Sequence, residues 1–417
     1  MTGPLAANEA ARRIVEDVRR QPPLRMPLDD ALDAVLAEDV VSRIDIPAWT
    51  NSAMDGYAAR GEDVRGASAE RPVQLRVVEH IPAGQFPTRP IGAGECARIF
   101  TGAPLPEGAD TVVRQEDTDG GAETVVITRD RDVGVNIRRT GEDIRRGATV
   151  LTAGTELGPA HLGVLASLAE AHPLVYRQPR VAILGSGDEI VDVDQPEEIL
   201  SGRKVASSNS HTLQALVRRT GAEPVNLGIA RDTPESLRTH LRAAADADLL
   251  VTTAGISVGE HDYLRAVLDE LGAEQRFWKV RMRPGAPVGF GFLGAVPWIG
   301  LPGNPVSTMV TFELFVRPAI RKMSGHSLPF RRSVPVRLAE PISLKPRLQH
   351  FLRAVVRERA DGPEARLTGP QGSGILTSMV AANALLVIPE GQFETPAGAL
   401  VQAIRLDDPA HRADPAF

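Results

Sequence analysis

The sequence predicts a multidomain protein of the α/β plus β class, with a mainly parallel α/β domain, an irregular β domain, a split helical domain and a small C-terminal β-barrel. Three observations predict this class. The chain has 417 residues, more than one hydrophobic core usually organises. Helix-like and strand-like segments alternate from residue 178 to 326. Short strand-like segments, interrupted by glycine and proline, occupy 47–137 and 327–417.

The beginning of the chain predicts helices. Residues 8–20 and 29–38 carry apolar side chains at helical spacing, and residues 159–171 show the same spacing again. Because these helices are short and amphipathic, we expect them to pack together. The sequence therefore predicts one domain built from two separated segments, 1–46 and 138–177.

The segment 47–137 predicts an irregular β domain. VQLRVVEH (73–80) and TVVITRD (124–130) alternate apolar and polar residues, as half-buried strands do. Glycine and proline are frequent around them, which predicts turns in place of helices.

Residues 178–326 predict a mainly parallel sheet with helices on both faces. RVAIL (180–184), ADLLVTTA (247–254) and PWIGL (297–301) are apolar strand candidates, and helical patterns lie between them. Loops that follow the strands of such a sheet meet at one rim, where ligands bind. The loops placed there are GSGDEI (185–190), AGISVGEHDY (254–263), RPGAP (283–287) and LPGNP (301–305).

The helical pattern stops after Gly325. SVPVRLAE (333–340), FLRAVVRE (351–358) and ALLVIPE (384–390) have the composition of strands. They predict a C-terminal β domain over 327–417.

Composition excludes several classes of function. A formal net charge of −6 and a pI of about 5.9 argue against sequence-independent binding to nucleic acid or to an anionic membrane. The chain has no apolar run of about 18 residues and no signal-peptide pattern, so we expect no membrane span. Cys96 is the only cysteine, which excludes internal disulfides and a thiolate zinc cluster and fits a reducing cytoplasm. We therefore expect a cytoplasmic protein.

GSGDEI superficially resembles a dinucleotide-binding loop, but Ile190 stands where the third glycine is needed. The loop keeps the hydroxyl of Ser186 and the carboxylates of Asp188 and Glu189, which suit a divalent cation or a substrate amide. An acidic helix start, stabilised by the helix dipole, is the structural alternative.

AGISVGEHDY places two glycines and Ser257 after an apolar strand, which predicts a phosphate-binding turn. Asp262 is alternatively the cap of the helix that follows. Asp232, in IARDTPESL, is likewise a natural turn or capping residue. Neither segment by itself shows whether its aspartate has a structural or a functional role.

Three further segments are polar and rich in turn residues. Asp55 and Gly56 fit an ordinary tight turn. Thr101 offers a hydroxyl on a proline-stiffened loop, and Asp143 lies in NIRRTGEDIRRG, which is typical of a solvated, salt-bridged surface. Each segment alone leaves the structural and the functional interpretation open.

LPGNP predicts a sharp helix start. Asn304 would cap the helix and Pro305 would occupy its first position. Gly303 lets a ligand approach the backbone, and free amides at such a turn suit an anion.

These loops form an ordered series along essentially the whole chain. The series is NSAMDGYA (51–58), TGAPLPEGAD (101–110), GED (141–143), SGDEI (186–190), SSN (207–209), GISVGEHDY (255–263), RPGAP (283–287), GLPGNPVS (300–307) and QGSGILTSM (371–379). In this order the segments resemble the molybdopterin molybdenumtransferase family, known as MoeA and as the E domain of gephyrin.

The resemblance implies an enzyme that inserts molybdenum from molybdate into adenylylated molybdopterin and releases AMP, in the last step of molybdenum cofactor synthesis. It implies a homodimer joined largely by the split helical domain. The active cleft would lie between the molybdopterin-binding α/β domain (178–326) of one subunit and the β-rich domain (47–137) of the other. Molybdopterin adenylyltransferase and apo-molybdoenzymes are further candidate partners.

The resemblance also implies roles for individual residues, carried over by position. The catalytic positions are Asp55, Thr101, Asp143, Glu189, Asp232, Asp262 and Lys279. The positions for molybdopterin and its phosphate are Ser186, Gly187, Asp188, Ser257, Gly259, Pro302, Gly303, Asn304, Pro305 and Ser307. Molybdate would bind at Arg283, Pro287, Arg353 and Ser373, and a magnesium ion at Glu189 and Asp262. Both substrates are anions, so cations and oriented donors suit their chemistry.

The chain departs from the family pattern at Ala286, where KPGKP is common, and at Ala254, where a glycine is usual. Losing a charged hydrogen bond of the kind a lysine at 286 would make costs roughly 1.5–3 kcal/mol. The alternative hypothesis is therefore a catalytically weakened paralogue that acts as a molybdopterin-binding or scaffold protein. Tungstate remains an alternative to molybdate, because the two oxyanions share charge and shape.

Overall fold

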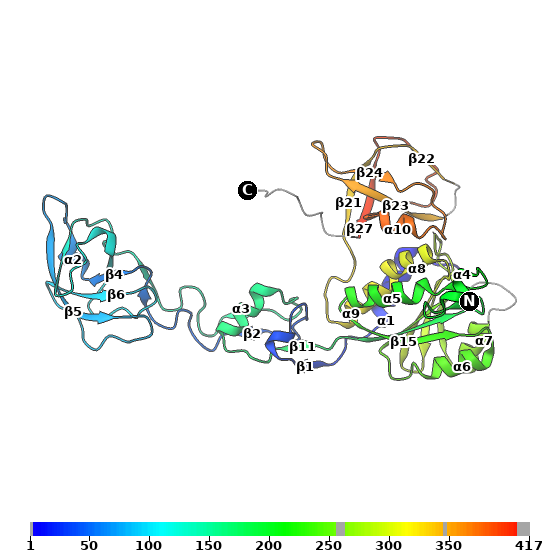
Figure 1. Cartoon of the computed structure of the whole chain (residues 1–417), viewed down its shortest axis with the longest axis horizontal. Coiled ribbons are helices and arrows are strands. Elements are labelled where there is room, and N and C mark those ends of the chain that lie inside the picture. The colour runs from blue at the N-terminus through cyan, green and yellow to red at the C-terminus, as the bar shows by residue number, and fades with distance from the viewer. Residues whose placement is uncertain (1–2, 256–262, 345–347, 407–417) are drawn as a thin grey trace. The chain divides into compact units, whose positions relative to one another are not determined.

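The computed structural model describes residues 3–255, 263–344 and 348–406 (Figure 1). The chain forms two compact units. The larger unit comprises Met1–Ala37, Gly154–Pro159 and His172–Phe417, and the smaller unit comprises Glu38–Ala153 and Ala160–Ala171. Each unit is described by itself below.

A mainly parallel sheet organises the larger unit, as predicted. In spatial order its strands are β15 (Glu223–Ala230), β12 (Arg180–Ser186), β16 (Leu249–Thr253), β20 (Val296–Leu301), β19 (Gly289–Leu293) and β17 (Glu274–Phe277). The first four strands run parallel, whereas β19 and β17 are antiparallel to their neighbours. The strand β19 is not predicted by its sequence, because its glycines weaken the strand pattern.

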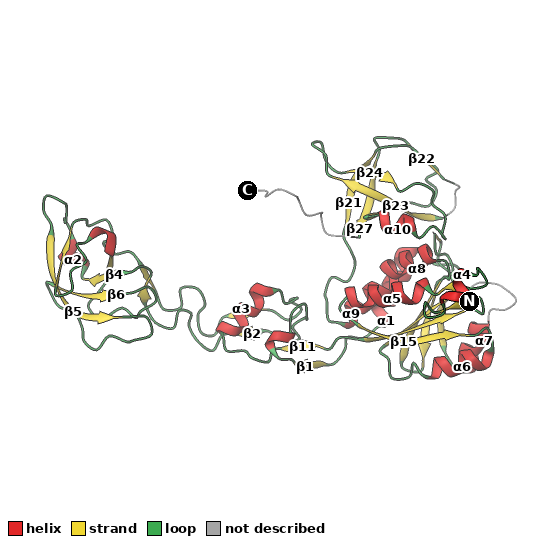
Figure 2. Ribbon diagram, viewed as in Figure 1, coloured by secondary structure: helices red, strands yellow, loops and turns green. Residues whose placement is uncertain are grey.

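Helices cover both faces of this sheet (Figure 2). Alternate residues of a strand point to opposite faces, so Val181 and Ile183 of β12 join one core while Ala182 and Leu184 join the other. The first core is covered by α1 (Ala7–Asp17), α5 (Ser208–Arg219) and α8 (Pro305–Thr311), and the second by α6 (Pro234–Arg242) and α7 (Tyr263–Glu270).

The predicted helix over 29–38 is wrong. The structure has a short 3₁₀ turn, η1 (Leu28–Asp30), and Asp33 follows with a φ of 62°. Val35 and Leu36 then form isolated β-bridges with Glu156 and Val175. Pairing with these distant segments replaces the local hydrogen bonds of a helix.

Two other predicted helices exist. The one over 159–171 is α3 (Pro159–Ser167). The one over 8–20 is α1, which packs against the helix α9 (Arg317–Met323) and against η3 (Phe312–Val316), the π-helical segment that joins α8 to α9. The proposed division of the chain into four domains stays a prediction.

The C-terminal strands close into a small barrel, as predicted. The ring consists of β23 (Gln349–Arg357), β24 (Glu364–Leu367), β21 (Ser333–Leu338), β27 (Leu400–Arg405) and β25 (Ala384–Ile388), and pairing of β25 with β23 closes it. The short strand β18 (Met282–Arg283) pairs in parallel with β23. Alternate residues Leu352, Ala354 and Val356 fill the interior.

The smaller unit contains the predicted irregular β domain. Its sheet runs in the order β7 (Thr111–Arg114), β4 (Gly56–Ala59), β6 (Glu95–Ile99), β5 (Val73–Ile81) and β8 (Thr124–Ile127). Gly56 is required in β4, because a Cβ there would lie 1.9 Å from the carbonyl oxygen of Val113. Cys96 is a free, buried thiol, and burial raises its pKa to about 12.

Short elements complete the described parts. The strand pairs are β1 (Pro23–Arg25) with β11 (Leu174–Tyr176), β2 (Val40–Val41) with β10 (Thr149–Leu151), β3 (Asn51–Ser52) with β9 (Ile137–Arg138), β13 (Ile190–Val191) with β14 (Val205–Ala206), and β22 (Ile342–Ser343) with β26 (Glu394–Thr395). The short helices are α2 (Gly61–Val64), η2 (Gln115–Asp117), α4 (Pro196–Leu200) and α10 (Thr377–Ala381).

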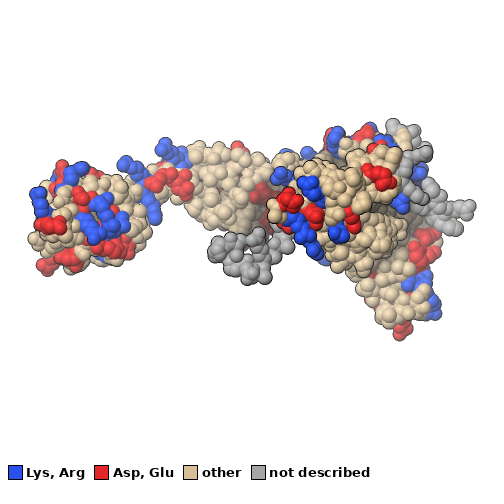
Figure 3. Space-filling model, turned by 90° about the horizontal axis from the view of Figure 1, so that it is seen from above, with Lys and Arg blue, Asp and Glu red and all other residues tan. Residues whose placement is uncertain are grey.

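Acidic and basic side chains are interspersed on the face drawn in Figure 3. This mixture agrees with the small net charge of the chain. Over the part of the chain that the structure describes, no helix has the length and apolarity needed to cross a bilayer.

Candidate functional site

A cavity of about 580 Å³ lies beyond the carboxyl ends of β12, β16 and β20. This is the edge where open α/β sheets bind ligands. The residues that line it include Ser186, Glu189, Asn209, Thr253, Ala254, Gly255, Pro287, Pro302, Gly303, Asn304, Pro305 and Gly374. All four loops predicted to meet at this rim contribute to the lining, AGISVGEHDY through Ala254 and Gly255 and RPGAP through Pro287.

The loop after β12 brings a hydroxyl and a carboxylate to the cavity. Ser186 is buried at the end of the strand, and Gly187 follows with a φ of 137°. A Cβ on Gly187 would lie 2.9 Å from a carboxylate oxygen of Glu189, so the glycine leaves room for that carboxylate. The strand β13 follows the loop, so the alternative interpretation as an acidic helix start is wrong.

Asp188 and Asp232 hold two neighbouring loops together. The backbone N–H of Asp188 donates to Oδ2 of Asp232 at 3.2 Å, and the N–H of Asp232 donates to Oδ1 of Asp188 at 3.3 Å. Nζ of Lys204 donates to the carbonyl oxygen of Asp188 at 2.6 Å. The N-cap of α6 is Thr233, which accepts from the backbone N–H of Ser236, so the interpretation of Asp232 as the helix cap is wrong.

Asn209 is a cavity residue that the predicted site did not include. Its Nδ2 donates to Oγ1 of Thr253 at 3.0 Å and to the carbonyl oxygen of Gly303 at 2.7 Å. Thr253 in turn donates to the carbonyl oxygen of Pro302, which fixes the orientation of the amide. Oδ1 of Asn209 is buried and accepts no hydrogen bond from the described residues. The signal in the sequence was SSN at a helix start on the binding rim.

The helix start at LPGNP differs in part from the prediction. Asn304 is the N-cap by backbone conformation and Pro305 takes the first position, but the Asn304 side chain makes no capping hydrogen bond. Pro305 has no N–H, and the N–H of Val306 donates to the carbonyl oxygen of Ser373 at 3.1 Å. The N–H of Val306 is therefore already paired within the chain, and anion binding by the other amides of this turn stays a prediction.

Arg353 lies beneath the loop that carries Ser373 and Gly374. The side chain is fully buried, and Nε donates to Oγ of Ser378 at 3.0 Å. Its Nη atoms donate to the carbonyl oxygens of Gln371 at 3.2 Å and Gly372 at 2.9 Å. Burial holds the pKa of Arg353 below its usual value. The guanidinium thus shapes a loop that reaches the cavity, and direct binding of molybdate by Arg353 stays a prediction.

The loop RPGAP contributes less to the cavity than predicted. Pro287 lines it, whereas Arg283 is an exposed residue of β18. The carbonyl oxygen of Ala286 accepts from the N–H of Val280 at 2.9 Å. Lys279 is exposed, and its carbonyl oxygen accepts from the N–H of Leu5. Roles for Arg283 and Lys279 stay predictions, as does a role for Ser307, which is buried within α8.

In the smaller unit the structure brings Asp55 and Thr101 together. The N–H of Thr101 donates to Oδ1 of Asp55 at 2.8 Å, and Oγ1 of Thr101 donates to the same oxygen at 2.7 Å. These two bonds, with a smaller contribution from Arg98, hold the pKa of Asp55 below its usual value. Asp143 is exposed on the turn after β9, and its N–H donates to the carbonyl oxygen of Ile46.

Part of the predicted site lies outside the described residues. Ser257, Gly259 and Asp262 fall in 256–262. Within 3–255, 263–344 and 348–406, no three His, Cys, Asp or Glu side chains are grouped as metal ligands. A magnesium ion on Glu189 and Asp262 therefore stays a prediction.

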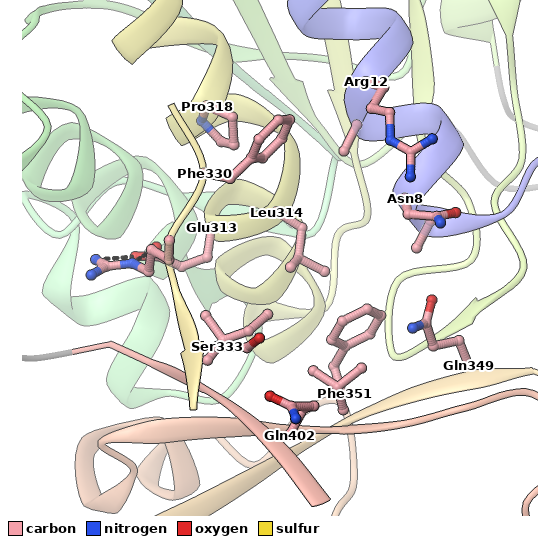
Figure 4. Close-up of a pocket in the computed structure, with 15 residues that line it drawn as sticks. Asn8, Arg12, Glu313, Leu314, Pro318, Phe330, Ser333, Gln349, Phe351 and Gln402 are labelled. Atoms are coloured by element: carbon pink, nitrogen blue, oxygen red, sulfur yellow. Dashed lines mark hydrogen bonds and ion pairs between the residues drawn. The ribbon is translucent and has the colours of Figure 1, made fainter. Parts of the chain in front are cut away.

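A second cavity, of about 350 Å³, lies between α1, η3 and the barrel (Figure 4). Leu314, Phe330 and Phe351 surround it, and Arg331 is paired with Glu313 at 2.7 Å. This mainly apolar lining does not suit the anions expected of the first cavity.

Three regions of the chain match known families. Residues 5–169 match the MoeA N-terminal region, described as domains I and II. Residues 182–322 match a family described as a probable molybdopterin binding domain, and residues 335–406 match the MoeA C-terminal region, described as domain IV.

Similar proteins extend over nearly the whole chain. Molybdopterin molybdenumtransferase 2 of Mycobacterium tuberculosis is 38% identical over 403 residues, covering 95% of this chain and 98% of that protein. Molybdopterin molybdenumtransferase of Nostoc sp. is 38% identical over 387 residues, covering 89% and 86%. A crystal structure of the molybdopterin biosynthesis moeA protein from Pyrococcus horikoshii OT3 has a TM-score of 0.81 at 30% identity, covering 97% of this chain and 100% of that one.

The parallel sheet, its rim cavity and the C-terminal barrel define an α/β protein with the architecture of molybdenum cofactor biosynthesis proteins. The chain belongs to the MoeA family, whose curated relatives are molybdopterin molybdenumtransferases. The resemblance stated from the motifs is thereby confirmed.

Proposed function

We propose that this chain is a molybdopterin molybdenumtransferase, which inserts molybdenum from molybdate into adenylylated molybdopterin and releases AMP. The observation that carries the proposal is similarity to such enzymes over nearly the whole chain, at 33–38% identity. The rim cavity supports it, because the cavity has the size of a small-molecule site and is lined by the motif loops.

Different residues of the cavity have different roles in this proposal. Asn209 and Ser186 present polar atoms at the end of the sheet, where they can bind the polar edges of the substrate. The glycines of the loops let the substrate approach the backbone. Arg353 stabilises the loop of Ser373 and Gly374, which closes one side of the cavity.

We propose Glu189 as the described residue that helps to hold a magnesium ion, with Asp262 as its predicted companion. A carboxylate at the cavity fits such an ion, because Mg²⁺ commonly binds one or two carboxylates and takes its other ligands from water and substrate phosphates. When bound, the ion would neutralise phosphate charge.

We further propose a homodimer in which Asp55 and Thr101 of one subunit act at the cavity of the other. Helix α3 supports dimer formation, because it is apolar around its circumference and only Leu165 is buried. Val41, Ile44 and Val135 of the same unit are also exposed large apolar residues. Apolar surface of this kind is typical of an interface.

A reducing cytoplasm is the proposed location, since the lone cysteine Cys96 is free and buried. The proposed further partners are molybdopterin adenylyltransferase, which would supply the substrate, and apo-molybdoenzymes, which would receive the product.

One assay tests the proposed function. Purified protein is given adenylylated molybdopterin, magnesium and molybdate, and AMP release and formation of active cofactor are measured. The proposal expects both products in a molybdate-dependent reaction. Substrate binding without AMP release would instead support the weakened paralogue, the second candidate, which is favoured by Ala254 and Ala286 at positions where the family usually has other residues.

A further inference from the structure

Asp55 lies in the turn between β3 and β4, called here the Asp55 turn. Arg98 of β6 lies beside this turn and belongs to none of the family motifs. Its guanidinium carbon is 5.0 Å from the centre of the Tyr57 ring and 4.9 Å from the centre of the Phe100 ring. Antiparallel pairing of β4 with β6 places Arg98 opposite Tyr57, so the contact is built into the sheet. The side chain is half-buried and its orientation is fixed by two aromatic rings.

Arg98 donates hydrogen bonds to two segments next to the turn, β4 and η2. Nη1 donates to the carbonyl oxygen of Gly56 at 3.1 Å, and Nη2 donates to Oε1 of Gln115 at 2.7 Å. The N–H of Gln115 donates in turn to the carbonyl oxygen of Asp55 at 3.1 Å. Arg98 therefore ties together β4, β6 and η2 at the residue next to Asp55.

Among the groups that act on the Asp55 carboxylate, Arg98 is the charged one. Thr101, from the loop after β6, and Gln115, from η2, are uncharged, and Arg98 supplies the favourable charge interaction. Because Asp55 is exposed, its orientation depends on these contacts and not on burial.

We propose that Arg98 is a positioning residue, which holds the Asp55 carboxylate in one orientation toward the substrate. The proposal rests on the proposed function, in which Asp55 acts at the cavity of the other subunit. Lysine is a poor replacement, because only the planar guanidinium can stack between the rings and donate in two directions at once.

The test compares Arg98→Met, Arg98→Lys and the control Arg76→Met. Arg76 lies on the neighbouring strand β5 and pairs with Glu95 at the surface, away from Asp55. We expect Arg98→Met to lower kcat at least about tenfold, because misplacement of a reacting group has effects of this size, while KM for both substrates stays within about twofold. Arg98→Lys should recover only part of kcat, and Arg76→Met should match the wild type.

Carbon-13 NMR titration of the Asp55 carboxyl group supplies a readout that does not need activity. In Arg98→Met the pH at the midpoint of the Asp55 titration should rise, because a positive charge that favours the carboxylate is lost. Gln115→Leu keeps the charge and removes one anchor, so it should lower kcat with a smaller change of the midpoint. It also replaces Arg98→Met if that variant does not fold.

The outcomes separate the two proposals. A wild-type protein that releases no AMP contradicts the proposed function, and the NMR titration then still tests the charge interaction of Arg98 with Asp55. A folded Arg98→Met variant with wild-type kcat and an unmoved Asp55 midpoint would overturn the positioning role. A loss of activity in Arg76→Met equal to that in Arg98→Met would also overturn it.

Discussion

Asn209 marks a binding site, because its side chain has a buried acceptor with no donor among the described residues. Both N–H groups of its amide have protein acceptors, and its buried oxygen accepts none from the described residues. A buried acceptor without a donor is unfavourable, so a bound ligand that supplies an N–H or O–H would relieve it. This is a property of three-dimensional contacts that the tripeptide SSN could only suggest.

We expect Asn209→Ala to weaken binding of adenylylated molybdopterin roughly tenfold to a hundredfold, the range for loss of a buried hydrogen bond. Gln214→Ala, on the same helix but outside the cavity lining, is the matched control. Titration calorimetry measures both. Equal affinity in the two variants would remove Asn209 from the site.

Ala254 is the second informative residue. It has a φ of 71° and its Cβ faces Gly303 across the cavity floor, where a Cβ on Gly303 would lie 3.2 Å away. An L-residue in this conformation is strained, and the family usually has glycine there.

Ala254→Gly should raise the free energy of unfolding of the larger unit by about 0.5–1 kcal/mol, since relief of strain exceeds the entropy that glycine adds to the unfolded chain. Denaturant unfolding followed by the fluorescence of the buried Trp298 measures it. Ala215→Gly, on the exposed side of α5, should do the opposite and lower stability by about 1 kcal/mol. A loss of stability in both variants would contradict strain at Ala254.

At the scale of elements, strand periodicity and turn chemistry were the reliable signals. β12, β16 and β20 follow from apolar runs, and their alternating residues divide between two cores. The strand β19 forms a hairpin with β20 and was missed because its glycines weaken the strand pattern, whereas the prediction for 29–38 was wrong because that segment pairs with distant segments. Local pattern cannot identify such pairing, because the partners are far apart in sequence.

The end of α9 carries a pH-dependent contact. His326 is buried, and its Nδ1 accepts from Nη2 of Arg321 at 3.0 Å, with the carboxylate of Glu156 at 3.4 Å. Burial and the positive charges of Arg321 and Arg317, against the opposing charge of Glu156, lower the pKa of His326 to about 4. The imidazole is therefore neutral in the folded protein at neutral pH.

Stability of the larger unit should fall as the pH is lowered from about 6.5 toward about 4, because the unfolded chain then binds a proton at His326 and the folded chain does not. We expect His326→Gln to flatten this dependence, since glutamine still accepts from Arg321 and does not titrate there. His172→Gln, at an exposed position, is the control and should keep the wild-type slope. Equal slopes in wild type and His326→Gln would exclude the contact as the cause.

At the scale of the whole molecule, the proposed dimer makes a distinct prediction. Asp55 and Glu189 belong to different compact units, and the family resemblance assigns them to one site formed by two subunits. Asp55→Asn and Glu189→Gln should each be inactive alone. Coexpression should restore about a quarter of the wild-type rate, because half of the dimers are mixed and each mixed dimer has one intact site.

Mixed dimers purified by two different tags allow the rate to be measured without the parent proteins. A mixed dimer that is as inactive as its parents would place both residues of a working site in one subunit. Leu162→Asp on α3 should also weaken dimerisation in sedimentation, whereas Leu200→Asp, an exposed residue of α4, should not.

The sequence by itself determined the class of fold, the rim of the sheet where the motif loops meet and the family of the chain. Periodicity, turn residues and short motifs are local, so these features can be read without long-range contacts. Only the tertiary structure decided that Arg353 is buried beneath its loop, that the N–H of Val306 is paired with Ser373, that Asn209 has an unused acceptor and that Arg98 is hydrogen-bonded to Gly56 and Gln115. Each of these depends on which distant atoms meet, and that is settled by packing.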